Sequence, residues 1–72
     1  MNKKNKIKIS VNGKQMKVNL KFSIKNLIER LKMPISKVAI ELNREIVNKK
    51  NTNKIFLKKG DKVEIVHFIG GG

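Results

Sequence analysis

The sequence contains no cysteine, tryptophan or tyrosine, and its only histidine is His67. Without cysteine the chain has no disulfide, no thiolate metal ligand and no thiol nucleophile. A single histidine excludes a metal site built from several histidines and leaves a histidine-based catalytic triad without support. Because His67 is in phase with Val63, Ile65 and Ile69 on an apolar strand, we interpret it as a packed or half-exposed strand residue rather than a catalytic one.

Acidic residues are few, and a phosphate-binding loop is missing. The five acids are not spaced in a way that indicates a catalytic carboxylate pair. No glycine-rich loop leads into a helix, so nothing would hold a phosphate group. We therefore predict that the chain is not an enzyme, has no catalytic or metal-binding residue and binds no cofactor, so that any ATP would be bound by a partner. The acids are Glu29, Glu41, Glu45, Asp61 and Glu64.

Long hydrophobic runs are also lacking. No segment approaches the roughly 20 apolar residues of a membrane span, and the basic N-terminus is not followed by the apolar core of a signal peptide. We therefore expect a cytoplasmic protein with no membrane partner. At 72 residues, we expect one domain, residues 1–72, with an aliphatic core.

The net charge of +13 has two interpretations. A basic chain is typical of a nucleic-acid-binding protein that contacts phosphates. Alternatively, codon bias explains the charge, since lysine, asparagine and isoleucine have AT-rich codons and supply nearly half of the residues. We favour the second interpretation because the lysines are spread along the chain and base-stacking aromatics are scarce. The lysines would still attract acidic partners.

Alternating apolar residues predict a β-hairpin over residues 7–20. Asn12-Gly13 stands between the two alternating runs, and this dipeptide is typical of a type I′ turn, in which both central residues have positive φ. The period then changes: Ile24, Leu27, Ile28 and Leu31 share one face of a helix. Ser23 is placed to cap its first turn, and Pro34 predicts that the helix ends near Lys32 or Met33.

Three further strands follow the helix. Residues 38–42 alternate, Asn43-Arg44 predicts a tight turn and residues 45–47 a short strand. We expect a loop or single 3₁₀ turn over 48–53, a brief return to the core at 55–57, a turn at 58–61 with Gly60 at positive φ, and a last strand over 62–69. The order β-β-α-β-β-β predicts an α+β fold in which a mixed sheet of four to five strands wraps one helix. We identify this arrangement as a β-grasp.

The last strand has two faces, and we expect only one of them to face the helix. If the face with Val63 and Ile65 meets the helix, Val66 and Phe68 are exposed beside the point where the chain leaves the strand. Exposed apolar groups often mark a docking site. The alternative is that residues 55–57 or the N-terminal hairpin cover them.

Three glycines, Gly70–Gly72, follow the strand without a spacer. Glycine loses the most conformational freedom when it is ordered, so three in a row are a poor way to finish a fold. Without Cβ atoms they would thread a narrow channel and present the carboxylate of Gly72 on a flexible tether. The alternative is a frayed end or an expression remnant.

At these residues the sequence resembles the ThiS family, the ubiquitin-like sulfur carriers of thiamine (thiazole) biosynthesis. The resemblance rests on "VNGK" (Val11–Lys14), "ELNREIV" (Glu41–Val47), "LKKGDKVEIVHF" (Leu57–Phe68) and "IGGG" (Ile69–Gly72). It implies a β-grasp fold, in agreement with the order of elements above. The high lysine content departs from the family but alters no motif.

The resemblance also implies a chemistry for the tail. An E1-like enzyme (ThiF) would adenylate Gly72 with ATP and magnesium. Sulfur from a cysteine desulfurase would replace the adenylate to give a thiocarboxylate, from which thiazole synthase (ThiG) takes sulfur. Gly70 and Gly71 would thread the partner sites, and Val66, Phe68 and Ile69 would form the docking surface.

Two other functions remain as alternatives. The small subunit of molybdopterin synthase shares this fold and tail chemistry, but "ELNREIV" and "VHFIGGG" favour the thiamine protein. A basic RNA-binding module would explain the charge but not the glycines.

Overall fold

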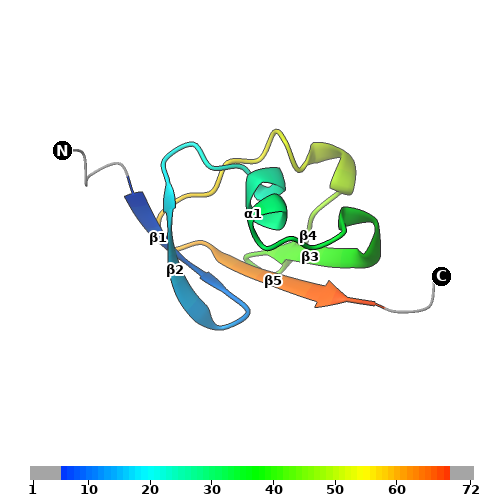
Figure 1. The fold of residues 1–72 in the computed structure, drawn as a ribbon. Helices are drawn as coiled ribbons and strands as arrows, with labels where there is room; N and C mark the ends of the chain where they lie inside the picture. Colours follow the sequence, from blue (N-terminus) through cyan, green and yellow to red (C-terminus); the bar gives the residue numbers. More distant parts are fainter. Residues whose placement is uncertain (1–5, 69–72) are drawn as a thin grey trace.

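The computed structural model describes residues 6–68 as one mixed sheet with a single α-helix across one face (Figure 1). The strand order is β2-β1-β5-β3-β4. Only β1 and β5 pair in parallel, and the other neighbours are antiparallel. The predicted β-grasp fold and its order of elements are confirmed. The elements are β1 (Lys6–Val11), β2 (Lys14–Asn19), α1 (Ile24–Arg30), the 3₁₀ turn η2 (Ile35–Lys37), β3 (Val38–Leu42), β4 (Glu45–Ile46), the 3₁₀ turn η3 (Lys49–Asn51) and β5 (Lys62–His67).

The two hairpins turn at dipeptides that begin with asparagine. Asn12 and Gly13 have φ of 51° and 84°, and Asn43 and Arg44 have φ of 51° and 73°. Positive φ at both central residues is the signature of the type I′ turn, whose twist matches that of the flanking strands. Both predicted turns are confirmed, and Gly60 has φ of 85° as expected.

The start of α1 has a partner for each of its first backbone N–H groups. The Ser23 hydroxyl accepts a hydrogen bond from Asn26 N–H, and the Asn26 side chain accepts one from Ser23 N–H, each at 3.0 Å. Ile24 and Lys25 donate their N–H groups to backbone carbonyls of the 52–55 segment. This capping confirms Ser23 as the N-cap and ties the long connection before β5 to the helix.

The helix ends at Arg30, earlier than the predicted Lys32 or Met33. Lys32 has φ of 58°, its N–H bonds Glu29 C=O, and Met33 N–H bonds Ile28 C=O. These bonds form a Schellman motif, a helix end that usually has glycine where Lys32 stands. The end is therefore set by the left-handed Lys32, two residues before Pro34.

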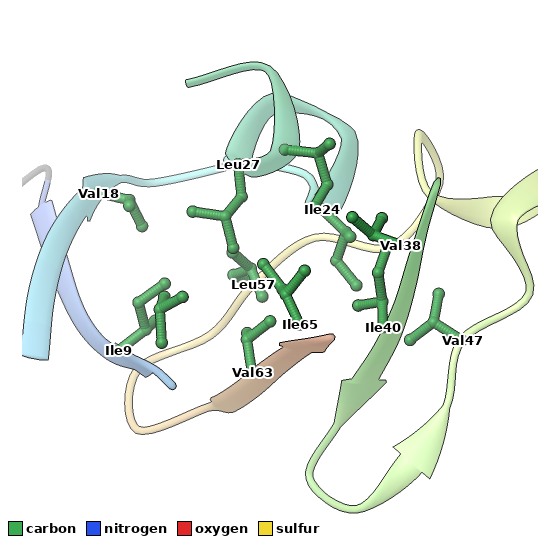
Figure 2. Packing of buried hydrophobic residues seen from close by; sticks show 12 residues of the cluster. Ile9, Val18, Ile24, Leu27, Val38, Ile40, Val47, Leu57, Val63 and Ile65 are labelled. Atoms are coloured by element: carbon green, nitrogen blue, oxygen red, sulfur yellow. The ribbon is translucent and has the colours of Figure 1, made fainter. Parts of the chain in front are cut away.

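The core lies between α1 and the inner face of the sheet (Figure 2). Leu27 and Ile24 project from the helix toward Val63 and Ile65 of β5 (Figure 2). Because β5 is the central strand, its inner side chains contact residues from both halves of the sheet. The twelve buried apolar residues are Ile9, Val11, Val18, Ile24, Leu27, Ile28, Val38, Ile40, Val47, Leu57, Val63 and Ile65.

Candidate functional site

The candidate site is the end of β5, from which the chain continues toward the glycines. β5 ends at His67 rather than at the predicted Ile69, and Ile69 and Gly70–Gly72 lie outside the described residues. Phe68 follows the strand and donates its N–H to Lys37 C=O at 3.0 Å. The register of β3 and β5 therefore holds the chain up to Phe68.

Val66 and Phe68 are exposed, which is the first of the two arrangements predicted for the end of the last strand. Val66 is 62% accessible on the outer face of the sheet, which faces away from α1, and Phe68 is 41% accessible. Residues 55–57 and the N-terminal hairpin do not cover them, so the alternative was wrong. Lys49 Nζ lies 5.3 Å from the centre of the Phe68 ring, within the range of a cation–π contact.

The apolar surface continues across the outer face to β4. Ala39, on β3, is the register partner of Val66 and is exposed. Ile46, on β4, is 78% accessible. The two residues belong to neighbouring strands, so the exposed apolar groups extend from β5 across β3 to the sheet edge.

His67 is a strand residue, as the sequence predicted. It is exposed, whereas the buried residues of its strand face are Val63 and Ile65. It lies at the end of β5, where the strand continues beyond α1 (Figure 1). The packed environment, one of the two that the sequence predicted, is therefore wrong, whereas the half-exposed strand position agrees with the exposure of His67.

Two glutamates stand opposite each other on the outer face. Glu41 of β3 and Glu64 of β5 are register partners in the antiparallel ladder. The sequence interpretation missed this pair because it sought carboxylates at close sequence spacing. Alternation alone places each residue on a polar strand face, and only the pairing of β3 with β5 brings them together.

Five lysines from separate parts of the sequence lie together on the other half of the outer face. Lys8 and Lys17 are register partners in β1 and β2. Two hollows in this region are both lined by Lys8 and by Lys59 of the turn before β5, and Lys17 lines one of them. This lysine cluster is a feature that the sequence interpretation did not predict. Its members are Lys6, Lys8, Lys17, Lys59 and Lys62.

A separate groove of about 560 Å³ runs between the C-terminal half of α1 and the two 3₁₀ turns. Ile28, Met33 and Ile35 form its apolar part, and Lys25 and Lys49 are among its polar lining residues. Lys49 is shared between this groove and the Phe68 contact.

Residues 6–68 contain no group of three or more His, Cys, Asp or Glu that would hold a metal ion. In the same part of the chain, none of the helices has the length and apolar character that crossing a membrane requires.

Comparison with known proteins relates nearly the whole chain to one family. The ThiS family matches residues 9–72. The chain belongs to the ThiS family. The resemblance drawn from the hairpin, the "ELNREIV" segment and the C-terminal strand is therefore confirmed.

Individual relatives of the ThiS family agree with this assignment. The sulfur carrier protein ThiS of Bacillus subtilis is 34% identical over 65 residues, which are 89% of this chain and 98% of that protein. The crystal structure of a thiamine biosynthesis protein (ThiS) from Geobacter metallireducens superposes with a TM-score of 0.79 at 32% identity, over 92% of this chain and 100% of that one.

A third relative is much longer. A thiazole synthase of Paramagnetospirillum magneticum is 38% identical over 66 residues, or 92% of this chain. The chain spans only 20% of the length of that protein. A ThiS-like segment therefore occurs within a larger chain named for thiazole synthesis.

Proposed function

We propose that this protein is a sulfur carrier for the formation of the thiazole of thiamine. Membership of the ThiS family is the observation that carries the proposal. The relative named sulfur carrier protein ThiS matches over nearly its whole length, and its name states the role proposed here. The match within a thiazole synthase supports a functional association between the carrier and that enzyme.

In the proposed chemistry the reactive group is the carboxylate of Gly72. A carboxylate is a poor electrophile and must be activated. On an E1-like enzyme (ThiF), a carboxylate oxygen of Gly72 would attack the α-phosphorus of ATP, with Mg²⁺ present, to give an acyl adenylate and release pyrophosphate. The terminal sulfur of the persulfide that a cysteine desulfurase forms would then displace AMP to give an acyl disulfide. A thiol, such as excess cysteine, would reduce this to the thiocarboxylate and a disulfide. ThiG would take this sulfur for the thiazole, and the carrier carboxylate would be regenerated.

The fold would serve as a rigid holder of the tail in this scheme. β5 is hydrogen-bonded on both sides, to β1 and to β3, and the backbone bond of Phe68 to Lys37 extends this attachment to the end of the described chain. Gly70 and Gly71 would then thread the partner sites, because they carry no side chain to clash there. Val66, Phe68 and Ile69 would contact the partner around the tail.

Incubation with purified partners tests this proposal. The protein is combined with ATP, Mg²⁺, an E1-like enzyme, a cysteine desulfurase and cysteine, and its intact mass is recorded. We expect a gain equal to the replacement of one oxygen by sulfur, located on Gly72 by fragmentation. Deletion of Gly71–Gly72 should abolish the gain and leave the fold unchanged. An unchanged wild-type mass, with enzymes that modify another ThiS protein in parallel, would refute the proposal.

The small subunit of molybdopterin synthase remains the nearest competing function, since it would show the same mass gain. Supplying the thiocarboxylate form to thiazole synthase distinguishes the two. Loss of the added sulfur with ThiG, but not with the large subunit of molybdopterin synthase, is the result we expect.

The net charge of +13 and the lysine cluster favour nucleic-acid binding as a second function. A phosphate-only interaction would weaken steeply as salt is raised. We expect any retention of unrelated RNA to disappear at moderate salt. Sequence-selective binding that persists under those conditions would instead support an RNA-binding role.

A further inference from the structure

The outer face of the sheet carries a pair of like charges in a protein that has few acids. Glu41 and Glu64 are directly opposite in the β3–β5 ladder. Residues so placed have Cβ atoms about 4.5–5.5 Å apart, and like charges at that separation destabilise a sheet. Two of the five acids in the chain thus occupy a position that is unfavourable for folding.

Neither carboxylate has a hydrogen-bonding role within the described chain. None of the side-chain hydrogen bonds found in residues 6–68 involves Glu41 or Glu64. Asp61 is different, since its oxygens accept bonds from the Asn43 side chain and from Lys58 N–H and so organise a turn. The carboxylates of the pair are therefore available to another molecule.

The surroundings of the pair resemble a protein interface rather than an ordinary charged surface. Ile46 is the register partner of Glu41 on β4 and is 78% accessible. Val66 follows Glu64 on the same face of β5 and is 62% accessible. Apolar groups therefore flank the carboxylates, and the exposed end of β5 lies immediately beyond them.

The charges on the outer face are also separated by sign. The lysine cluster occupies β1, β2 and the start of β5. The glutamate pair and the apolar residues occupy β3, β4 and β5 from its middle onward, so the two groups meet between Lys62 and Glu64. A partner that covers this face would meet positive charge at one end and negative charge at the other. Such complementarity selects one orientation of docking and disfavours the reverse one.

We propose that Glu41 and Glu64 together receive a basic side chain, for which arginine is best suited, from the surface of the adenylating enzyme. This inference rests on the sulfur-carrier function proposed above and identifies the chemistry of partner recognition. A guanidinium group presents several N–H donors in one plane and can bond two carboxylates at once. Apolar residues around it would pack on Val66 and Ile46 and exclude water from the charged contact.

Replacement of both glutamates by glutamine tests the inference. The readout is thiocarboxylate formation, with the concentration of carrier varied to separate KM from kcat. We expect the Glu41→Gln/Glu64→Gln variant to raise KM for the carrier roughly tenfold and to leave kcat nearly unchanged, because docking weakens while the tail is intact. Its melting temperature should be equal or higher, since the cross-strand repulsion is removed.

A matched variant controls for net charge. Glu29→Gln/Glu45→Gln also removes two negative charges, but from α1 and from the inner face of the edge strand β4. It should therefore keep the wild-type KM. A KM for the Glu41/Glu64 variant that equals or falls below the KM of this control overturns the inference. If wild-type protein gains no sulfur at all, the proposed function itself fails, and this inference fails with it.

Discussion

The side-chain amide of Asn12 bonds both backbone groups of Ile65, a residue 53 positions away. Asn12 Oδ1 accepts from Ile65 N–H at 2.8 Å, and Asn12 Nδ2 donates to Ile65 C=O at 3.3 Å. β1 pairs with β5 only through Ser10 and Val11, so the Asn12 amide continues the ladder where the backbone of β1 turns away. Asn43 acts similarly on the other side of β5, where its Oδ1 accepts from Lys62 N–H. The two turn asparagines therefore brace the strand that leads to the tail.

Replacement of Asn12 by glycine should remove the side-chain bonds to Ile65 while keeping a residue that suits the turn. Glycine adopts the positive φ of 51° without strain but has no amide, so both bonds to Ile65 are lost. We expect the free energy of unfolding in urea to fall by about 1–3 kcal/mol, because the Ile65 backbone is buried. The Ile65 amide should also exchange faster with solvent.

Asn43→Gly is the matched comparison for this change, since its side-chain bonds are solvent-exposed. Its effect should be the smaller of the two, because exposed groups exchange their partner for water. Equal free energies of unfolding for Asn12→Gly and wild-type protein would show that the bonds from Asn12 to Ile65 contribute nothing to stability.

Two non-glycine residues at positive φ offer sites for stabilisation. Lys32 has φ of 58° at the end of α1, and Arg44 has φ of 73° in the second hairpin turn. A side chain in the left-handed region costs about 1 kcal/mol, which glycine avoids. We expect Lys32→Gly and Arg44→Gly each to raise the melting temperature by about 4–8 °C in a domain of this size.

Gly60→Ala is the reverse control for these substitutions. Gly60 has φ of 85°, and an added Cβ would have no heavy atom within 4 Å, so any loss of stability comes from the backbone alone. A drop of about 1 kcal/mol is expected. If it melts at the wild-type temperature, the conformational argument for Lys32 and Arg44 is wrong.

Shortening Leu27 should damage the core severely. Leu27 is completely buried at the centre of the single helix. Leucine-to-alanine changes in cores cost about 2–5 kcal/mol, and a domain this small has little more stability than that. Denaturant titration should give a much lower midpoint than for Leu31→Ala, whose side chain is only partly buried.

Val66 should matter for sulfur transfer but not for folding. Its side chain is mostly exposed, so Val66→Ser should change the free energy of unfolding by less than about 0.5 kcal/mol. We expect KM for the carrier to rise several-fold in the thiocarboxylate assay.

Leu20→Ser provides the control for Val66, since Leu20 is 49% accessible and follows the edge strand β2, two strands away from β5. It should transfer sulfur as the wild-type protein does. Equal KM values for the two variants would contradict a docking role for Val66.

Much of the fold was predictable because its signals are local. Asn12-Gly13 and Asn43-Arg44 specify their turns through the φ angles of two residues, and Ser23 caps the helix through a bond to a residue three positions on. The end of α1 was misplaced because lysine occupies a left-handed position that is usually glycine, so the sequence contained no visible stop before Pro34. Exposure of Val66 was one of two open outcomes, since alternation indicates a face but not what covers it.

The sequence by itself determined the hairpins, the single amphipathic helix, the order of the elements and the resemblance to the ThiS family, because each depends on residues that are close together along the chain. Only the tertiary structure decided that Glu41 faces Glu64, that five dispersed lysines form one cluster, and that Asn12 braces Ile65. These neighbours are set by which strands pair and in what register. Packing of the whole core against one helix selects that pairing, and no short stretch of sequence contains it.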